Sequence, residues 1–119
     1  MERRVNIWGV LKDIEIDYDV YSNESISNIQ SDALEKFFNS DIKEIKDDTF
    51  IKDYIKDNFD ISVEDIFEYV TPQTIYVENN QSERVVALLC DFSLDEENGL
   101  AIVFNNEIFS EIGPQDIIL

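Results

Sequence analysis

Residues 85–92 read VVALLCDF and residues 100–104 read LAIVF, two strongly apolar runs in a chain of 119 residues. Short, nearly continuous apolar runs are typical of strands that are covered on both faces. A polar turn at residues 94–99 separates the runs, and Asn105-Asn106 follows the second, where Asn tolerates the positive φ that two-residue hairpin turns need. Ile108–Ile112 then returns as a further strand. The C-terminal half therefore predicts an antiparallel β-meander.

The N-terminal part also contains a strand pattern, at residues 13–21. Its residues alternate, so that Ile14 and Ile16 point to one face while acidic side chains occupy the other. A period of two with one polar face predicts a half-buried strand. Residues 4–10 are its expected hairpin partner, with Gly9 at the bend.

Helical spacing appears between these two β regions. Residues 22–25 offer helix-starting side chains before an apolar stripe that ends near Phe38, and residues 47–49 open a second amphipathic segment. Residues 62–70 resemble a third short helix that stops before Pro72. We therefore expect one α+β domain over residues 1–119: an N-terminal strand or hairpin, two to three helices, then a C-terminal antiparallel β-meander packed on the helices.

The charge of the chain narrows the classes of function. There are 27 acidic residues, 9 basic residues and no histidine, for a net charge of −18, and Arg84 is the one base after residue 60. Such a surface repels nucleic acid and anionic membranes and attracts basic proteins. No segment is long enough to span a bilayer or form a signal-peptide core, and a single cysteine suits a reducing compartment. We expect a cytoplasmic protein that binds neither nucleic acid nor membrane.

Few side chains in this chain could carry out catalysis. Histidine is the usual general base near neutral pH, and this chain has none. Ser-His-Asp arrangements and histidine-containing metal sites are therefore excluded. Cys90 lies in an apolar strand without a cationic neighbour, which predicts an inert core thiol. No glycine-rich phosphate loop is present. Enzymatic activity is left open but disfavoured, and we expect no cofactor.

Carboxylates are the remaining candidates for function. Two groups are candidate contacts for a partner: Asp91, Asp95, Glu96 and Glu97 near one turn, and Glu15, Asp17 and Asp19 on the acidic strand face. The first group could also hold a hard cation or act as an acid–base pair, although its spacing does not fit an EF-hand. Both groups could instead be ordinary solvated surface.

The C-terminal half resembles a family of small bacterial domains of unknown function. Members carry a W-D-x-E-H-G-L-x-I hairpin followed by V-G-x-Q-D; here residues 94–102 read LDEENGLAI and residues 112–116 read IGPQD. Leu94 and Asn98 replace the Trp and His of that pattern. The N-terminal half is similar as well, with an alternating strand that leads into residues 23–26. Some members of this family look like immunity or accessory proteins encoded beside toxins, so the resemblance implies protein binding.

Three functions remain open at this stage. The leading hypothesis is a non-enzymatic acidic module that binds a basic protein partner, with neutralisation of a basic bacterial toxin as its specific form. The first alternative is a divalent-metal-binding protein or enzyme that uses the carboxylates. The second is a homodimeric accessory domain, since the apolar strands at residues 85–92 and 100–104 need cover on both faces.

Overall fold

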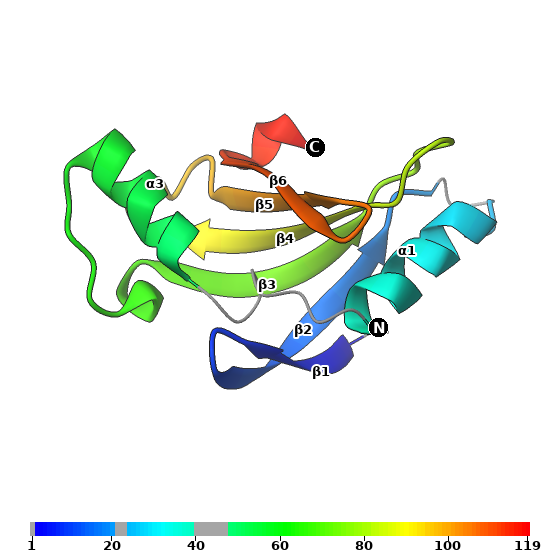
Figure 1. Cartoon of the computed structure of the whole chain (residues 1–119), viewed down its shortest axis with the longest axis horizontal. Coiled ribbons are helices and arrows are strands. Elements are labelled where there is room, and N and C mark those ends of the chain that lie inside the picture. Colours follow the sequence, from blue (N-terminus) through cyan, green and yellow to red (C-terminus); the bar gives the residue numbers. More distant parts are fainter. Residues whose placement is uncertain (1, 21–23, 40–47) are drawn as a thin grey trace.

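The computed structural model describes residues 2–20, 24–39 and 48–119, and all strands in this part of the chain form one sheet (Figure 1). Its six strands are β1 (Glu2–Ile7), β2 (Val10–Tyr18), β3 (Val70–Val77), β4 (Val85–Phe92), β5 (Leu100–Asn105) and β6 (Ile108–Gly113). The strands lie side by side in chain order. Neighbouring strands are antiparallel except β2 and β3, which are parallel. A parallel pair requires a long crossover, and the helices lie in that crossover.

The predicted fold class is wrong because the N-terminal hairpin and the C-terminal meander are not separate units. They form one mixed sheet, joined where Glu15–Tyr18 pairs with Thr74–Val77. The described residues hold two α-helices, α1 (Asn28–Asn39) and α3 (Thr49–Phe59), and are mostly sheet. An alternating pattern shows that a strand is half-buried but says nothing about its neighbour, so the sequence did not reveal this parallel joint.

The third predicted helix, at residues 62–70, is also wrong. Only Ile66–Glu68 is helical, as the 3₁₀ turn η1, which begins where the Asp65 carboxylate accepts a hydrogen bond from the Phe67 amide at 3.0 Å. Val70 is already the first residue of β3. Pro72 disfavours helix at the residue before it, and a bulge between Pro72 and Thr74 accommodates a residue without an amide proton.

The β1–β2 hairpin turns at Trp8 and Gly9, whose φ angles are 51° and 86°. The predicted bend at Gly9 is therefore confirmed, although β2 begins at Val10 and not at residue 13. The Trp8 ring packs on Phe67 with 5.6 Å between centroids. Its Nε1 is buried without a hydrogen-bond partner in the described part of the chain.

Helix α1 is held to the sheet by a capping box. The Gln30 amide donates to Ser27 Oγ at 3.1 Å, and the Ser27 amide donates to Gln30 Oε1 at 3.0 Å. Gln30 Nε2 also donates to the carbonyls of Asp19 and Val77, at 3.0 and 3.3 Å. One buried side chain therefore starts the helix and ties it to the ends of β2 and β3. The predicted helix start at residues 22–25 lies partly outside the described residues.

Both helices bury their apolar stripes against the same face of the sheet, called here the inner face. Helix α3, predicted from residues 47–49, begins at Thr49, and its Ile51 and Ile55 are fully buried. It reaches the sheet through ring contacts of Phe50 with Phe109 and of Phe59 with Phe92. Figure 1 shows α3 and α1 at opposite ends of the sheet. None of the described helices is long and apolar enough to cross a membrane.

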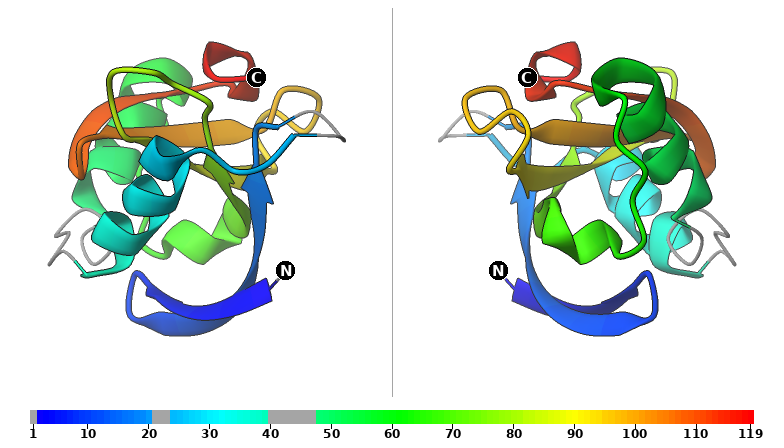
Figure 2. Two further views of the ribbon diagram at one scale, coloured as in Figure 1. Left: turned by 90° about the vertical axis from the view of Figure 1, so that its right-hand side faces the viewer. Right: turned by 90° about the vertical axis from the view of Figure 1, so that its left-hand side faces the viewer.

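The opposite, outer face of the sheet has a small apolar centre of its own. It consists of Val85, Ala87, Leu89, Ala101 and Val103. Tyr76 and the C-terminal residues Ile117 and Ile118 cover it, and Figure 2 shows the C-terminal 3₁₀ turn η2 (Gln115–Ile117) on the side of the sheet away from α1 and η1. The prediction that β4 is covered on both faces is confirmed. Cys90 faces the inner side and is fully buried, and burial raises the pKa of its thiol.

Candidate functional site

The acidic residues of β2 lie on the outer face. Ile14 and Ile16 are buried on the inner side, while Glu15, Asp17 and Asp19 are exposed, as the alternation predicts. Glu15 pairs with Thr74, and Asp17 pairs with Tyr76. The structure therefore places this acidic row beside the apolar centre of the outer face.

Tyr76 lies among these carboxylates. Burial is the largest cause that raises the pKa of Tyr76 to about 12, and a hydrogen bond with Asp19 and the charges of Asp19, Glu78 and Asp17 contribute in the same direction. A carboxylate resists the appearance of a second negative charge next to it. Asp19 has a further contact, because its Oδ2 accepts a hydrogen bond from the Asn79 amide at 3.3 Å.

Asp95, one of the candidate contacts, has a structural role. Its carboxylate accepts from the Asn98 amide at 3.3 Å, and Asn98 Nδ2 lies 3.1 Å from both of its oxygens. This local bonding stabilises the β4–β5 turn. Burial raises the pKa of Tyr54 on α3, and the Asp95 charge adds to the effect. Asp95 is thus directed at the protein itself.

Gly99 and Gln115 also hold the β4–β5 turn and the C-terminus together. Gln115 Nε2 donates to the Cys90 carbonyl at 3.0 Å, and the Gln115 amide donates to the Asn98 carbonyl at 3.0 Å. Gly99 has a φ of +63°, and a Cβ at this position would lie 2.6 Å from Gln115 Nε2. This arrangement, the Gly99–Gln115 clasp, holds η2 against the apolar centre of the outer face.

A pocket of about 330 Å³ opens where η1 and β3 meet the end of β4. Its carboxylates come from three elements: Glu68 from η1, Asp91 from β4 and Glu96 from the β4–β5 turn. The other lining side chains are Tyr69, Thr71, Phe92 and Ser93. Asp91 Oδ2 accepts from Gln73 Nε2 at 3.1 Å. The pocket therefore combines negative charge, hydroxyl groups and an aromatic wall.

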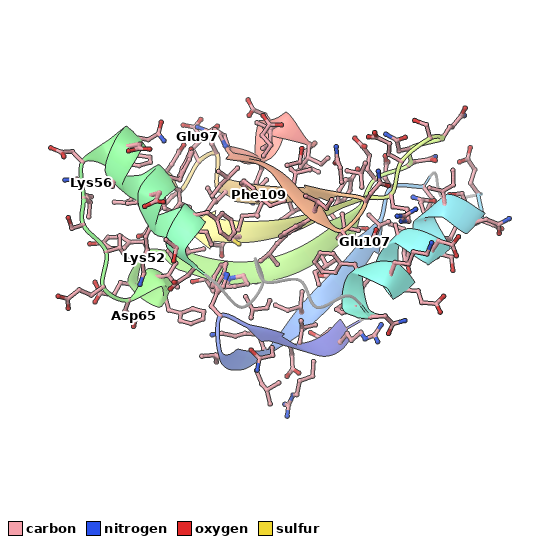
Figure 3. All side chains as sticks on the ribbon, viewed as in Figure 1. Lys52, Lys56, Asp65, Glu97, Glu107 and Phe109 are labelled. Atoms are coloured by element: carbon pink, nitrogen blue, oxygen red, sulfur yellow. The ribbon has the colours of Figure 1, made fainter. Side chains whose placement is uncertain are left out.

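Within residues 2–20, 24–39 and 48–119, no basic side chain forms an ion pair with an acid of this pocket. Most described bases are engaged elsewhere, in the ion pairs Arg4–Asp13, Lys52–Asp48, Lys56–Asp60 and Arg84–Glu107. The last of these pairs lies away from the β4–β5 turn, since Figure 3 shows Glu107 at the end of the sheet opposite Glu97. Arg3 and Lys12 lie over the rings of Phe38 and Phe67. Among the described residues, Glu15, Glu68 and Glu96 have no ion-pair partner.

The structure brings only some of the predicted residues together. Asp91 and Glu96 line one pocket, while Asp95 and Glu97 do not. Glu15 and Asp17 lie on the same face as Asp91 but two strands away. Sequence reasoning missed Glu68, Tyr69, Thr71 and Ser93. The pairing of Thr71 with Asp91 places Thr71 at the pocket, but the sequence pattern predicts a helix over residues 62–70 that stops before Pro72, so this pairing was not expected.

The described residues contain no group of three or more His, Cys, Asp or Glu side chains arranged to hold a metal ion. Residues 2–119 match the family described as Domain of unknown function (DUF6985), so the chain belongs to that family. No curated protein matches the chain, and no solved structure does.

Proposed function

We propose that this domain binds a basic protein partner through its outer face. The observation that carries the proposal is the placement of Glu15 and Asp17 from β2 and Asp91 from β4 on one face, with no basic ion-pair partner among the described residues. Carboxylates of this kind speed association with a positively charged surface and set the register of the complex. The chain carries a net charge of −18, which makes a basic partner the complementary one.

The specific form of the proposal is an immunity-type role, in which the domain neutralises a basic bacterial toxin. Two features support it: the acidic outer face, and the resemblance to small domains encoded beside toxins. A rigid sheet with unpaired carboxylates suits binding to the basic active site of a nuclease, because it offers negative charges where that site binds phosphates.

The test uses two double variants with the same change in net charge. Glu15→Lys with Asp17→Lys reverses the outer face, and Asp53→Lys with Asp57→Lys reverses exposed acids on α3. The genes adjacent to this one are searched for a basic protein, and association with each such protein is measured at several salt concentrations. We expect the outer-face variant to lower the association rate roughly tenfold and to flatten its salt dependence, with a smaller effect of the α3 variant.

Equal losses in the two variants would show that net charge alone acts, with no defined surface. No binding to any basic protein encoded nearby would remove the immunity-type form. Binding that both variants leave unchanged would remove the outer face as the interface.

A further inference from the structure

The pocket between η1 and the end of β4 has the chemistry of a cation site that nothing so far explains. It holds about 330 Å³, which lies at the lower end of the range for ligand pockets and is ample for one long side chain. Its position is set by regular structure, since Thr71 on β3 pairs with Asp91 on β4 and the Ser93 amide donates to the Tyr69 carbonyl at 2.9 Å. The walls are therefore preformed.

The pocket carries uncompensated negative charge. Glu68, Asp91 and Glu96 approach it from three different elements, and none of its described lining residues is a lysine or arginine. In the described part of the chain none of the three has an ion-pair partner. Like charges at one cavity repel one another, so a cation that enters the pocket is attracted by the carboxylates that it approaches.

The remaining lining favours an organic cation over a metal ion. Tyr69 supplies aromatic surface, and Thr71 and Ser93 supply hydroxyl oxygens. The described residues include no acidic group arranged to ligate a metal. A guanidinium is planar, has five N–H donors in a fixed fork, is weakly hydrated and stacks on aromatic rings. An ammonium offers three donors and is more strongly hydrated.

We propose that this pocket binds the guanidinium end of an arginine side chain presented by the basic partner. This inference rests on the proposed function and adds to it the residue type that anchors the partner. The guanidinium would donate to the carboxylates of Asp91 and Glu96 and lie against the Tyr69 ring. Buried arginines are frequent energetic centres of protein interfaces, so one such anchor would account for much of the affinity.

The test titrates the ¹⁵N-labelled protein with arginine that is blocked at both termini, followed by nuclear magnetic resonance. We expect saturable shifts of the Tyr69, Thr71 and Ser93 amides, with a dissociation constant on the order of millimolar, which is typical of a single side chain. The blocked citrulline derivative, a neutral isostere, should leave these amides in place, and the blocked lysine derivative should bind more weakly.

Matched variants locate the effect. Glu96→Gln should weaken arginine binding roughly threefold, the magnitude of one exposed charge pair, while Glu97→Gln, the adjacent exposed acid outside the pocket, should leave it unchanged. The proposal is overturned by shifts that do not saturate, by equal shifts with citrulline, or by equal losses in both variants. It is also overturned if Mg²⁺ shifts the same amides and displaces arginine.

The two proposals can fail separately. If arginine does not bind the pocket while reversal of Glu15 and Asp17 still slows association, the outer-face interface stands without this anchor. If arginine binds but no basic protein does, the pocket is a cation site and the proposed function falls.

Discussion

At the residue scale, the contacts of Gly99 and Gln115 explain how the β4–β5 turn is joined to the C-terminus. Gly99 must be glycine because its φ is positive and because Gln115 occupies the space where a Cβ would stand. Asp95 and Asn98 bond to each other within the same turn. Gly99, Asp95 and Asn98 therefore stabilise the β4–β5 turn, and Gln115 joins that turn to the C-terminus.

Replacement of Gly99 tests the clasp. Gly99→Ala places a residue with a side chain at an unfavourable φ, and its Cβ would lie too close to both Gln115 Nε2 and the Cys90 carbonyl oxygen. We therefore expect it to lower the free energy of unfolding by about 2 to 3 kcal/mol. Gly9→Ala is the matched control, since Gly9 also has a positive φ but no atom lies within 4 Å of the position that its Cβ would take. It should cost about 1 kcal/mol. Equal costs, measured by urea denaturation, would contradict the clasp.

The ionisation of Tyr76 provides a pH-dependent absorbance signal from the surroundings of Asp17 and Asp19. Its folded pKa of about 12 lies above the ordinary value of 10.0, so the folded state holds this proton more tightly than the unfolded state. The resulting stability is fully present below pH 10 and is lost as the pH rises through about 12. Absorbance at about 295 nm, where tyrosinate absorbs, should show a late phase in the tyrosine titration that Tyr76→Phe removes. A titration of the wild type that lacks this late phase would contradict the burial of Tyr76 among these carboxylates.

At the element scale, prediction succeeded where a segment's own pattern decides its structure. The β2 alternation, the α3 stripe and the apolar β4 and β5 runs are local signals, and each element is observed. The β5–β6 turn is displaced by one residue, because Asn106 and Glu107 have the positive φ values and Glu107 pairs with Arg84. The start of β3 could not be predicted, since Pro72 argues against a strand unless the bulge after it is known.

The same limit, that a local pattern does not reveal strand pairing, explains why the lining of the pocket was not predicted in full. Its walls come from residues that are far apart in the sequence, and only the register of β3 against β4 brings Thr71 next to Asp91. Asp91 and Glu96 could be chosen from the clustering of acids, but the hydroxyl and aromatic lining depends on where β3 begins. The clustering of acids could not show that Glu96 lines the pocket while Asp95 forms hydrogen bonds within its own turn.

Gln30 is the connection between helix and sheet, and its removal should be costly. Gln30→Ala loses the cap on the Ser27 amide and leaves the carbonyls of Asp19 and Val77 without this donor. We expect a loss of about 2 to 3 kcal/mol in the free energy of unfolding. Ser27→Ala, which removes one cap bond and keeps the bonds to the sheet, should cost about 1 kcal/mol. Equal losses in urea denaturation would show that Gln30 acts only as a cap.

At the scale of the whole molecule, net charge sets a general cost. A net charge of −18 on 119 residues produces self-repulsion that is larger in the compact state. Salt screens that repulsion, so the melting temperature at about pH 7 should rise by several degrees when NaCl is raised from about 10 mM to about 500 mM. Sorbitol at equal osmolality controls for solvent effects. A melting temperature that falls with NaCl would show that attractive pairs dominate the charge balance.

The parallel joint between β2 and β3 has a consequence for how the chain reaches its native state. The β1–β2 hairpin and the β3–β6 meander each form from neighbouring segments, whereas the β2–β3 joint brings Tyr18 to Val77 across the whole crossover. Closing so long a loop costs entropy before any contact compensates for it, so this step should limit the rate. In stopped-flow refolding, Ile16→Val and Ile75→Val should slow folding, while Ile102→Val in the meander should mainly speed unfolding. The time that the chain spends with an open β3 edge would then determine its exposure to aggregation during synthesis.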